Sequence, residues 1–440
     1  MNEPPELPPA STRTGTEIPE KPELTLGFIP ITDCAPLVIA QEKGWFHKYG
    51  LEVSLSRQVS WANIRDKVVA GVLDGAHMLA AMPIATSLGL GEVKTPMVTA
   101  LSLDLNGNAI TVSGQLYRRM QAVAGEALTD CAQNARILAK TLLAEGSVRP
   151  ETPCFATVFP FSSHNYLLRY WLAAAGLAPD QDIRFMVIPP PYMVEMLRCG
   201  EIDGYCVGEP WNTQAIVEGV GQSLVTDYDI WNNHPEKVFG VTRDWAERYP
   251  KTHKAVLMAL LEASAWIDKP ENRPEVAAIL AREQYVNAAE AVISLSMNGA
   301  FRLGKGETPV AIPDFNVFHR YAANYPWPSH AVWFITQMYR WGQLDEVINI
   351  KKLAAEVYRP DLYREAAQAL GLPFPVGHYK TEGLHDRPYR LDGAVGELQL
   401  GPDSFCDGRV FDPADPVAYL AGFGIHNLSV SLDELARENP

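Results

Sequence analysis

Residues Leu24–Phe46 read L-T-L-G-F-I-P-I-T-D-C-A-P-L-V-I-A-Q-E-K-G-W-F, and Ser60–Leu79 read S-W-A-N-I-R-D-K-V-V-A-G-V-L-D-G-A-H-M-L. Leu24–Ile29 is a short apolar run that ends at a proline, which is typical of a buried strand. Thr32 and Asp33 stand directly before a second apolar run, which is the pattern of a helix N-cap. The stretch therefore predicts a strand followed at once by a helix.

The same pattern continues to Leu90. Leu51–Leu55 alternates like a second strand, Trp61 stands at the start of another helix, and a helix near Pro83–Leu88 follows the apolar run after Gly75. The unit is β-α-β-α-β, with two loops directed at one edge of the sheet. Ligands bind at that edge of open α/β sheets, and helix N-termini there attract anions.

The chain then repeats this plan. A-G-V-L-D-G-A-H (Ala70–His77) corresponds to C-G-E-I-D-G-Y-C (Cys199–Cys206), so each half has the same helix end, turn and strand start. Asn106-Gly107-Asn108 separates two strand-like runs and is the predicted hinge. We expect a disordered lead (1–23), a first part of lobe 1 (24–112), lobe 2 (113–225), and a return to lobe 1 with C-terminal helices and a surface tail around Phe405–Pro413 (226–440).

Composition excludes several functions. The net charge of −15 argues against direct binding of nucleic acid, so an anionic ligand needs positive charge supplied locally. The six cysteines form no C-x-x-C pair, which argues against a thiolate metal site but leaves one or two disulfides open. Scattered cysteines in a chain of this size are typical of a reducing compartment.

The start of the chain bears on localisation. Residues 1–22 are proline-rich and lack the apolar centre of a secretory signal, and no apolar run in the chain reaches the length of a membrane span. We therefore expect a soluble, cytoplasmic protein. The alternative is a longer precursor that was trimmed.

A set of ordered motifs carries a family resemblance. G-F-I-P-I-T-D-C-A-P-L, S-W-A-N-I-R-D, N-G-N-A-I, V-I-P-P-P-Y-M-V, V-G-E-P-W-N and W-N-N-H-P-E-K resemble the nitrate- and bicarbonate-binding proteins of ABC importers. That resemblance implies a type 2 periplasmic-binding-protein clamshell of the α/β class, with crossovers at the hinge. It is nearest to the cytoplasmic NasS-type nitrate sensors, which hold a NasT-like, ANTAR-type RNA-binding antiterminator inactive until nitrate or nitrite binds.

The resemblance also implies a binding site. Lys237 matches the cation beside nitrate, and its buried ammonium would balance the anion; the alternative is an exposed surface lysine. His164 would donate to the anion, and because histidine titrates near pH 6–7 it predicts tighter binding at lower pH in that window; the alternative is a surface histidine near a helix start.

Three further residues complete the expected lining. Trp61 would supply a flat wall, although a lobe-core tryptophan is a serious alternative. Asn108 stands where importer relatives carry Gln, and its shorter amide makes nitrite a rival to nitrate. Pro190 stands where relatives line the pocket, or it is simply a proline that ends a strand.

Thr32, Asp33, Glu209 and Trp211 are expected behind this lining or between the lobes, because a carboxylate facing the anion would repel it. Bicarbonate relatives place a calcium-binding carboxylate after the lysine. Here Val238 follows Lys237, which argues against a calcium-assisted bicarbonate site.

Three functions are compared. The first is a cytoplasmic nitrate/nitrite sensor without a cofactor, and the second is the periplasmic receptor of an importer. The third is an enzyme on the same scaffold, such as a pyrimidine synthase. It is disfavoured because the cysteines are dispersed and no catalytic triad, phosphate loop or metal motif is present.

Overall fold

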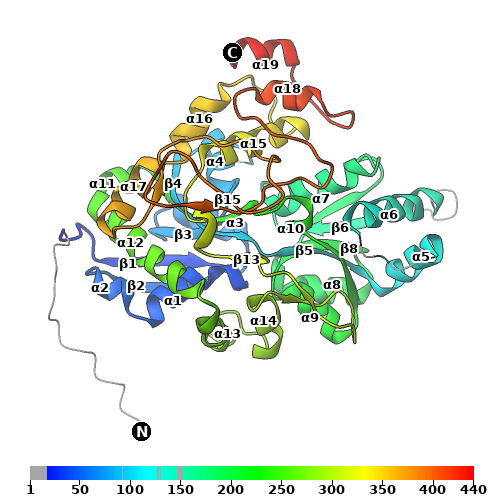
Figure 1. Cartoon of the computed structure of the whole chain (residues 1–440), viewed down its shortest axis with the longest axis horizontal. Coiled ribbons are helices and arrows are strands. Elements are labelled where there is room, and N and C mark those ends of the chain that lie inside the picture. The colour runs from blue at the N-terminus through cyan, green and yellow to red at the C-terminus, as the bar shows by residue number, and fades with distance from the viewer. Residues whose placement is uncertain (1–16, 92, 126–127, 129, 146–151) are drawn as a thin grey trace, which may run out of the picture.

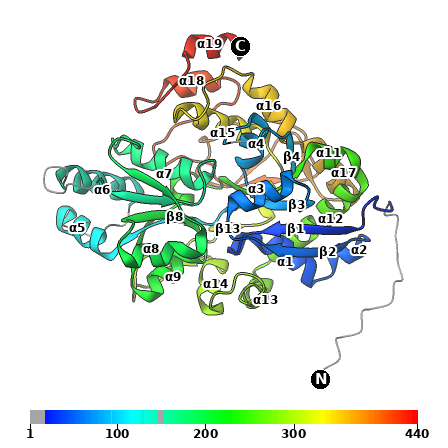
Figure 2. The ribbon, with the colours of Figure 1, turned by 180° about the vertical axis from the view of Figure 1, so that it is seen from behind.

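The computed structural model describes residues 17–91, 93–125, 128, 130–145 and 152–440, and these form two lobes, each built around one β-sheet (Figure 1; Figure 2). The predicted two-lobed α/β architecture is therefore present. No helix in the described ranges is long and apolar enough to cross a membrane.

Lobe 1 contains a mixed six-stranded sheet. Strand β1 pairs in parallel with β2 and β3, while β10 runs antiparallel between β3 and β4. In spatial order the strands are β13 (Asn316–Val317), β4 (Met97–Asn106), β10 (Pro235–Thr242), β3 (Gly75–Leu79), β1 (Glu23–Phe28) and β2 (Glu52–Arg57).

Lobe 2 repeats this topology in a five-stranded sheet. β6 pairs in parallel with β7 and β8, and β5 runs antiparallel between β8 and β9. Its order is β7 (Arg184–Val187), β6 (Cys154–Thr157), β8 (Gly204–Gly208), β5 (Asn108–Ser113) and β9 (Gly221–Thr226).

The crossings between the lobes follow from this topology. β4 lies in lobe 1 and β5 in lobe 2, so the chain crosses at Gly107, which has a φ of 98°. The predicted hinge triplet is thus the crossing point, but the predicted boundary after residue 112 is wrong, because β5 belongs to the second sheet. The chain returns to lobe 1 between Thr226 and Pro235.

The repeated motif has the same role in both lobes. The Asp74 carboxylate accepts from the Thr25 N–H of β1 at 3.0 Å, and the Asp203 carboxylate accepts from the Cys154 N–H of β6 at 2.9 Å. The following glycines, Gly75 and Gly204, begin β3 and β8. Each aspartate therefore ties its turn to the neighbouring parallel strand of its own lobe, β1 or β6.

Helices cover both faces of the lobe 1 sheet. Alternate β1 side chains (Leu24, Leu26 and Phe28) pack in a core beneath α1 (Ala35–Glu42), α12 (Pro250–Ile267), α13 (Arg273–Leu280) and α17 (Pro360–Ala369). A second core continues from lobe 1 into lobe 2. Its helices are α3 (Trp61–Val69), α4 (Met82–Leu88), α6 (Cys131–Glu145), α7 (Ser163–Ala174), α8 (Met193–Cys199), α15 (Pro328–Arg340) and α16 (Ile350–Val357).

Helix starts were only partly predictable. Ser60 caps α3 by accepting from the Asn63 N–H at 3.2 Å, and Ser162 caps α7. The predicted cap at Thr32-Asp33 is wrong: these residues form a 3₁₀ turn, Thr32–Cys34, and α1 begins after it without a side-chain cap. Both residues instead bond to parts of the chain that are distant in sequence.

Two predictions about the chain ends need correction. Residues 1–16 of the predicted disordered lead lie outside the described residues, but Lys21 donates its N–H to Thr252 Oγ1 at 2.9 Å and pairs with Asp74, so order begins before residue 24. The predicted surface tail is also partly wrong, because Phe405 and Phe411 are buried.

The C-terminal segment, defined here as residues 378–411, crosses the molecule from α17 towards α7 (Figure 1). Phe405 stacks on Trp231 with ring centroids 4.8 Å apart, and the Asn232 N–H donates to the Ser404 carbonyl at 3.0 Å. The segment therefore covers the stretch by which the chain returns from lobe 2 to lobe 1. Beyond it lie α18 (Pro416–Ala421) and α19 (Leu432–Glu438).

Candidate functional site between the lobes

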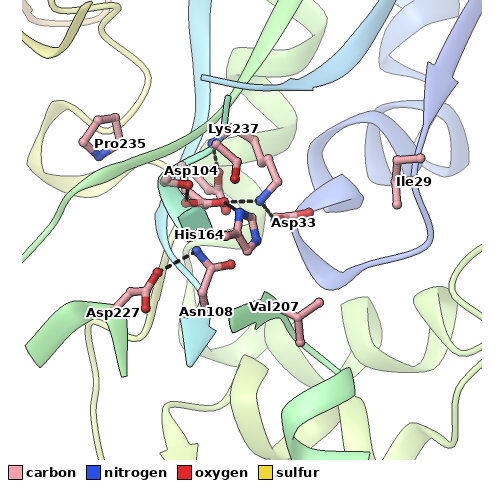
Figure 3. Close-up of polar contacts among 12 residues, drawn as sticks. Ile29, Asp33, Asp104, Asn108, His164, Val207, Asp227, Pro235 and Lys237 are labelled. Carbon is pink, nitrogen blue, oxygen red and sulfur yellow. Dashed lines mark hydrogen bonds and ion pairs between the residues drawn. The ribbon is translucent and has the colours of Figure 1, made fainter. Parts of the chain in front are cut away.

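Lys237 lies fully buried where the two lobes meet (Figure 3). Its ammonium contacts Asp33 Oδ2 at 2.5 Å and also the carboxylate of its own neighbour, Glu236. Successive strand residues normally point to opposite faces of a sheet. The register of β10 against β4 shifts on both sides of Lys237, and this bulge turns both side chains into one site.

Asp33 holds a second basic group. Its Oδ1 lies 3.0 Å from Nε2 of His77, a residue of β3. The His77 Nδ1 accepts from the Ile29 N–H at 3.5 Å, which leaves the proton on Nε2 to face Asp33. The 3₁₀ turn after β1 thus places one carboxylate between Lys237 and His77, consistent with the expectation that Asp33 orders basic groups.

Burial and ion pairing set the charges of this cluster. Burial raises the pKa of Asp33 and Glu236, but the adjacent Lys237 ammonium and the neighbouring histidines together outweigh burial and hold each pKa at about 2. Burial lowers the pKa of Lys237, yet the two carboxylates more than reverse this and raise it. At neutral pH the cluster formed by Lys237, Asp33 and Glu236 therefore carries one positive and two negative charges.

Asp104 and Asp227 are buried beside this cluster. Asp104 Oδ1 accepts a hydrogen bond from the Lys237 backbone N–H at 2.9 Å. Burial and, to a lesser extent, the negative charge of Asp33 raise the pKa of Asp104 well above its ordinary value. Burial and, to a lesser extent, the negative charge of Glu236 raise the pKa of Asp227 to about 8. Asp227 is therefore mainly protonated at neutral pH, and the raised pKa of Asp104 favours its neutral form, which limits the negative charge of the site.

His164 and Trp61 approach the cluster from opposite lobes. His164 lies in the first turn of α7 with Nδ1 3.3 Å from Glu236 Oε1, and the Lys237 ammonium lies 5.7 Å from the centroid of the Trp61 ring. His164 Nε2 and Trp61 Nε1 are buried and have no hydrogen-bond partner within the described residues. The Trp61 Nε1–H is a buried donor, and because such unpartnered donors are rare it points to a bound acceptor. His164 Nε2 is a donor only when the ring is protonated, because a neutral ring keeps its single proton on Nδ1, facing the Glu236 carboxylate.

The predicted pH window of His164 needs correction. Burial lowers the pKa of His164 to about 4, although Glu236 opposes this effect. The ring is therefore neutral at pH 6–7 in this closed arrangement. It gains a proton there only if a second negative charge comes close to it.

Asn108 begins β5 directly after the hinge. Its amide Nδ2 donates to Asp227 Oδ2 at 3.2 Å, and its Oδ1 is buried without a hydrogen-bond partner in the described chain (Figure 3). A Cβ on Gly208, the last residue of β8, would lie 3.3 Å from Asn108 Oδ1 and 3.6 Å from Asp33 Oδ2. The missing side chain of Gly208 lets these groups from both lobes come close together.

Of the remaining predicted residues, Thr32 and Glu209 connect the two lobes. The Thr32 N–H and hydroxyl both donate to the Glu209 carbonyl, at 2.8 and 3.2 Å, and so join the lobes. Burial raises the pKa of the Glu209 carboxyl to about 7, and Trp211 begins α9 (Trp211–Glu218). Pro190 is buried in the 3₁₀ turn before α8, and its place in the site stays a prediction.

Five residues of the site were not predicted from the sequence: His77, Asp104, Gly208, Asp227 and Glu236. His77 and Glu236 fall inside the motifs D-G-A-H and H-P-E-K, so their motifs were a signal. Strand alternation, however, assigns Glu236 to the face opposite Lys237, and only the bulge brings the two together. Within the described residues, no group of three His, Cys, Asp or Glu side chains is arranged to hold a metal ion.

Comparison with known proteins identifies the family of this chain. Residues 17–281 match the NMT1-like family. The nitrate/nitrite binding protein NrtA of Synechocystis sp. PCC 6803 is 35% identical over 424 residues, which cover 94% of this chain and 87% of NrtA. The chain belongs to the NMT1-like family and, within it, to the NrtA group.

The crystal structure of the periplasmic nitrate-binding protein NrtA from Synechocystis PCC 6803 matches with a TM-score of 0.82 and 33% identity, covering 93% of this chain and all of NrtA. The predicted type 2 clamshell fold is therefore confirmed. NrtA proteins are solute-binding proteins, so this chain falls in a group without enzymatic activity, as predicted.

Two longer relatives also match this chain. The nitrate import ATP-binding protein NrtC of Synechocystis sp. PCC 6803 is 42% identical over 92% of this chain, and the bicarbonate transport ATP-binding protein CmpC of the same organism is 40% identical over 96%. The chain spans 56% and 58% of these proteins, or about half their length.

Proposed function

We propose that this chain binds nitrate or nitrite between its lobes and acts as a cytoplasmic sensor that controls an RNA-binding antiterminator of the NasT type. Lys237 carries the proposal: it is a fully buried ammonium at the meeting of the lobes. The Trp61 indole N–H nearby has no partner among the described residues, and the His164 Nε2 becomes a second donor when the ring takes up a proton. A small planar anion is matched by one cation, several donors and a flat ring. The names of the NrtA relatives support the choice of anion.

Closure of the lobes provides the output. Thr32 in lobe 1 and Glu209 in lobe 2 bond directly, so the closed form has interlobe contacts that an opened form must lose. An anion that contacts groups from both lobes binds the closed form more tightly and shifts the population towards it. A regulator that recognises the open form is then released.

Calorimetric titration tests the ligand. Nitrate, nitrite, bicarbonate and chloride are titrated into the wild type, Lys237→Ala and the matched control Lys251→Ala, which removes an exposed lysine. We expect nitrate and nitrite to bind the wild type and the control, and Lys237→Ala to bind neither. Nitrate binding by a folded Lys237→Ala protein that equals the wild type would overturn the proposal.

A second substitution guards against misfolding. Lys237→Ala leaves the Asp33 and Glu236 carboxylates buried without their cation, which costs about 3–5 kcal/mol of stability. Trp61→Phe keeps a flat ring but removes the unpartnered Nε1–H. We expect it to fold and to bind nitrate about tenfold more weakly, because a hydrogen bond to a charged acceptor contributes about 1.5–3 kcal/mol.

A second candidate function is the receptor of an importer. Two of the relatives favour it, because NrtA is a periplasmic nitrate-binding protein and NrtC is a nitrate import ATP-binding protein. A pull-down separates the two functions: a sensor retains a NasT-type regulator without nitrate and releases it with nitrate, whereas a receptor retains permease subunits when nitrate is bound. Binding of bicarbonate but not nitrate in the titration would instead assign the chain the ligand of CmpC.

A further inference from the structure

The Glu236 carboxylate of β10 is fully buried and contacts side chains from both lobes. Its Oε1 pairs with the Lys237 ammonium and lies 3.3 Å from His164 Nδ1, and its Oε2 accepts a hydrogen bond from the Ser163 hydroxyl. Lys237 belongs to lobe 1, whereas Ser163 and His164 belong to lobe 2. One carboxylate therefore connects the two lobes beside the proposed anion site.

The lobe 2 side of this contact is the start of a helix. Ser163 and His164 are the first two residues of α7, and Ser162 before them is its N-cap, accepting from the Asn165 N–H at 3.1 Å. The cap therefore belongs to Ser162, and the Ser163 hydroxyl donates to Glu236 instead. The first turn of a helix is the positive end of its dipole, where a carboxylate is favourable. Glu236 thus supplies this negative charge to a lobe 2 helix from lobe 1.

The lobe 1 side of the contact is fixed by the backbone of β10. The Glu236 carbonyl accepts from the Ala80 N–H at 3.1 Å, and the register shift of β10 places the Glu236 side chain beside that of Lys237. The carboxylate therefore stays with lobe 1 when the lobes move. Its contacts with Ser163 and His164 are those that separation of the lobes breaks.

We propose that the Ser163–Glu236–Lys237 contact forms an interlobe latch, with Glu236 as the positioning residue that decides how firmly the closed lobes hold the anion. The anion itself contacts Lys237 and Trp61, and Glu236 acts through the groups that it orients. This role rests on the proposed function, because the ligand that is held is the anion proposed there.

The negative charge of Glu236 gives the latch a second effect, on proton uptake. Burial lowers the pKa of His164 to about 4, and Glu236 is the strongest of the groups that oppose this. An anion beside His164 raises that pKa further, so the ring gains a proton when both negative charges are in place. The other ionisable groups on which Glu236 acts, or which act on it, are His77, Asp104, Cys206, Asp227, His234 and Lys237.

Ser163→Ala tests the latch, because it removes one interlobe contact and leaves every charge in place. We expect stopped-flow measurement to show nitrate release about tenfold faster than in the wild type, since the lost hydrogen bond is to a charged acceptor. Ser54→Ala, at an exposed serine of β2, is the matched control and is expected to release nitrate at the wild-type rate. Small-angle X-ray scattering without an anion is expected to give Ser163→Ala a larger radius of gyration than the wild type.

Glu236→Gln tests the charge, because it keeps the size of the side chain and an acceptor for Ser163. Nitrate is titrated at about pH 6.5, the ordinary pKa of histidine, in buffers that differ in ionisation enthalpy. We expect the wild type to take up protons on binding and Glu236→Gln to take up few. A merely structural role of Glu236 would change the affinity but not this number of protons.

The outcomes separate the latch from the proposed function. Nitrate release at the wild-type rate, or an unchanged radius of gyration, in Ser163→Ala overturns the latch. Equal proton uptake by Glu236→Gln and the wild type overturns the role of the charge. Should the wild type bind no anion, the proposed function fails, while the scattering comparison still decides the latch.

Discussion

At Lys237, two carboxylates compete for one ammonium group. Asp33 and Glu236 both contact it, so the buried cluster is already negative before an anion arrives. Addition of nitrate without any other change brings a third negative charge into a region of low dielectric constant, which is costly. Uptake of a proton by a neighbouring group is the simplest compensation, and His164 is the candidate because it faces Glu236.

Proton uptake gives a pH-dependence with a definite sign. The pKa of His164 is about 4 in the closed form without an anion, and a nearby anion raises it. Between these two values binding takes up a proton, so nitrate affinity rises as pH falls, by at most about tenfold per pH unit. Calorimetry from pH 8 to 5, in buffers that differ in ionisation enthalpy, measures this uptake.

A His164→Gln variant is the control for that experiment, because it removes the titration but keeps a donor. Glu236, Lys237 and Asp33 also act on His164, as does His234, whose pKa burial lowers to about 4. If His164→Gln takes up as many protons as the wild type, the proton resides on another of these groups. A wild-type affinity that is constant from pH 5 to 8 contradicts the compensation itself.

Asp227 predicts a pH effect on stability. Its pKa rises from an unfolded value near 3.8 to about 8 in the fold, so its contribution is fully present below the lower value and is lost as pH rises through the higher one. Asp227→Asn keeps a neutral partner for Asn108. The excess of its melting temperature over that of the wild type is expected to grow by several degrees from pH 5 to pH 8.5. An equal change in both proteins would contradict the assignment.

At the scale of elements, the glycines at the two ends of strand β8 have different surroundings, so substitutions at them are expected to affect binding and folding differently. A Cβ on Gly208 at its end meets Asn108 Oδ1 and Asp33 Oδ2 at 3.3 and 3.6 Å, whereas a Cβ on Gly204 at its start meets the Phe155 ring at 2.6 Å. The first is a tight but tolerable contact between the lobes. The second is a clash inside one lobe.

We therefore expect two different outcomes from alanine in β8. Gly204→Ala should lower the free energy of unfolding by about 1–3 kcal/mol through overpacking. Gly208→Ala should leave the melting temperature nearly unchanged but weaken nitrate binding about tenfold, because it holds the lobes apart. Thermal unfolding and calorimetry on both variants test this, and a reversal of the two effects would contradict the assigned role of Gly208.

At the scale of the whole molecule, binding of the anion and of a regulator are coupled through one closure. If the regulator prefers the open form, it weakens nitrate binding by the same factor by which nitrate weakens the regulator. Measuring the affinity for each ligand with and without the other should give equal factors. An affinity for either ligand that does not change when the other is bound would show that the two are not coupled.

The sequence alone predicted the lobes because their signals are local. Apolar runs, turn residues and the repeated D-G turn at Asp74 and Asp203 depend on neighbours in the chain, and these placed most strands and helices correctly. Lys237, His164, Trp61 and Asn108 were named through the family resemblance, and the structure brings all four to the meeting of the lobes. Local pattern also predicted the crossing at Gly107.

Only the tertiary structure decided the charge of the site. The Asp33–Lys237 pair joins residues separated by most of lobe 2, and the approach of Glu236 to Lys237 depends on a bulge that exists only when β10 pairs with β4. Sequence patterns report the period and polarity of one segment, whereas ion pairs, protonation and contacts between lobes depend on which distant segments the fold brings together.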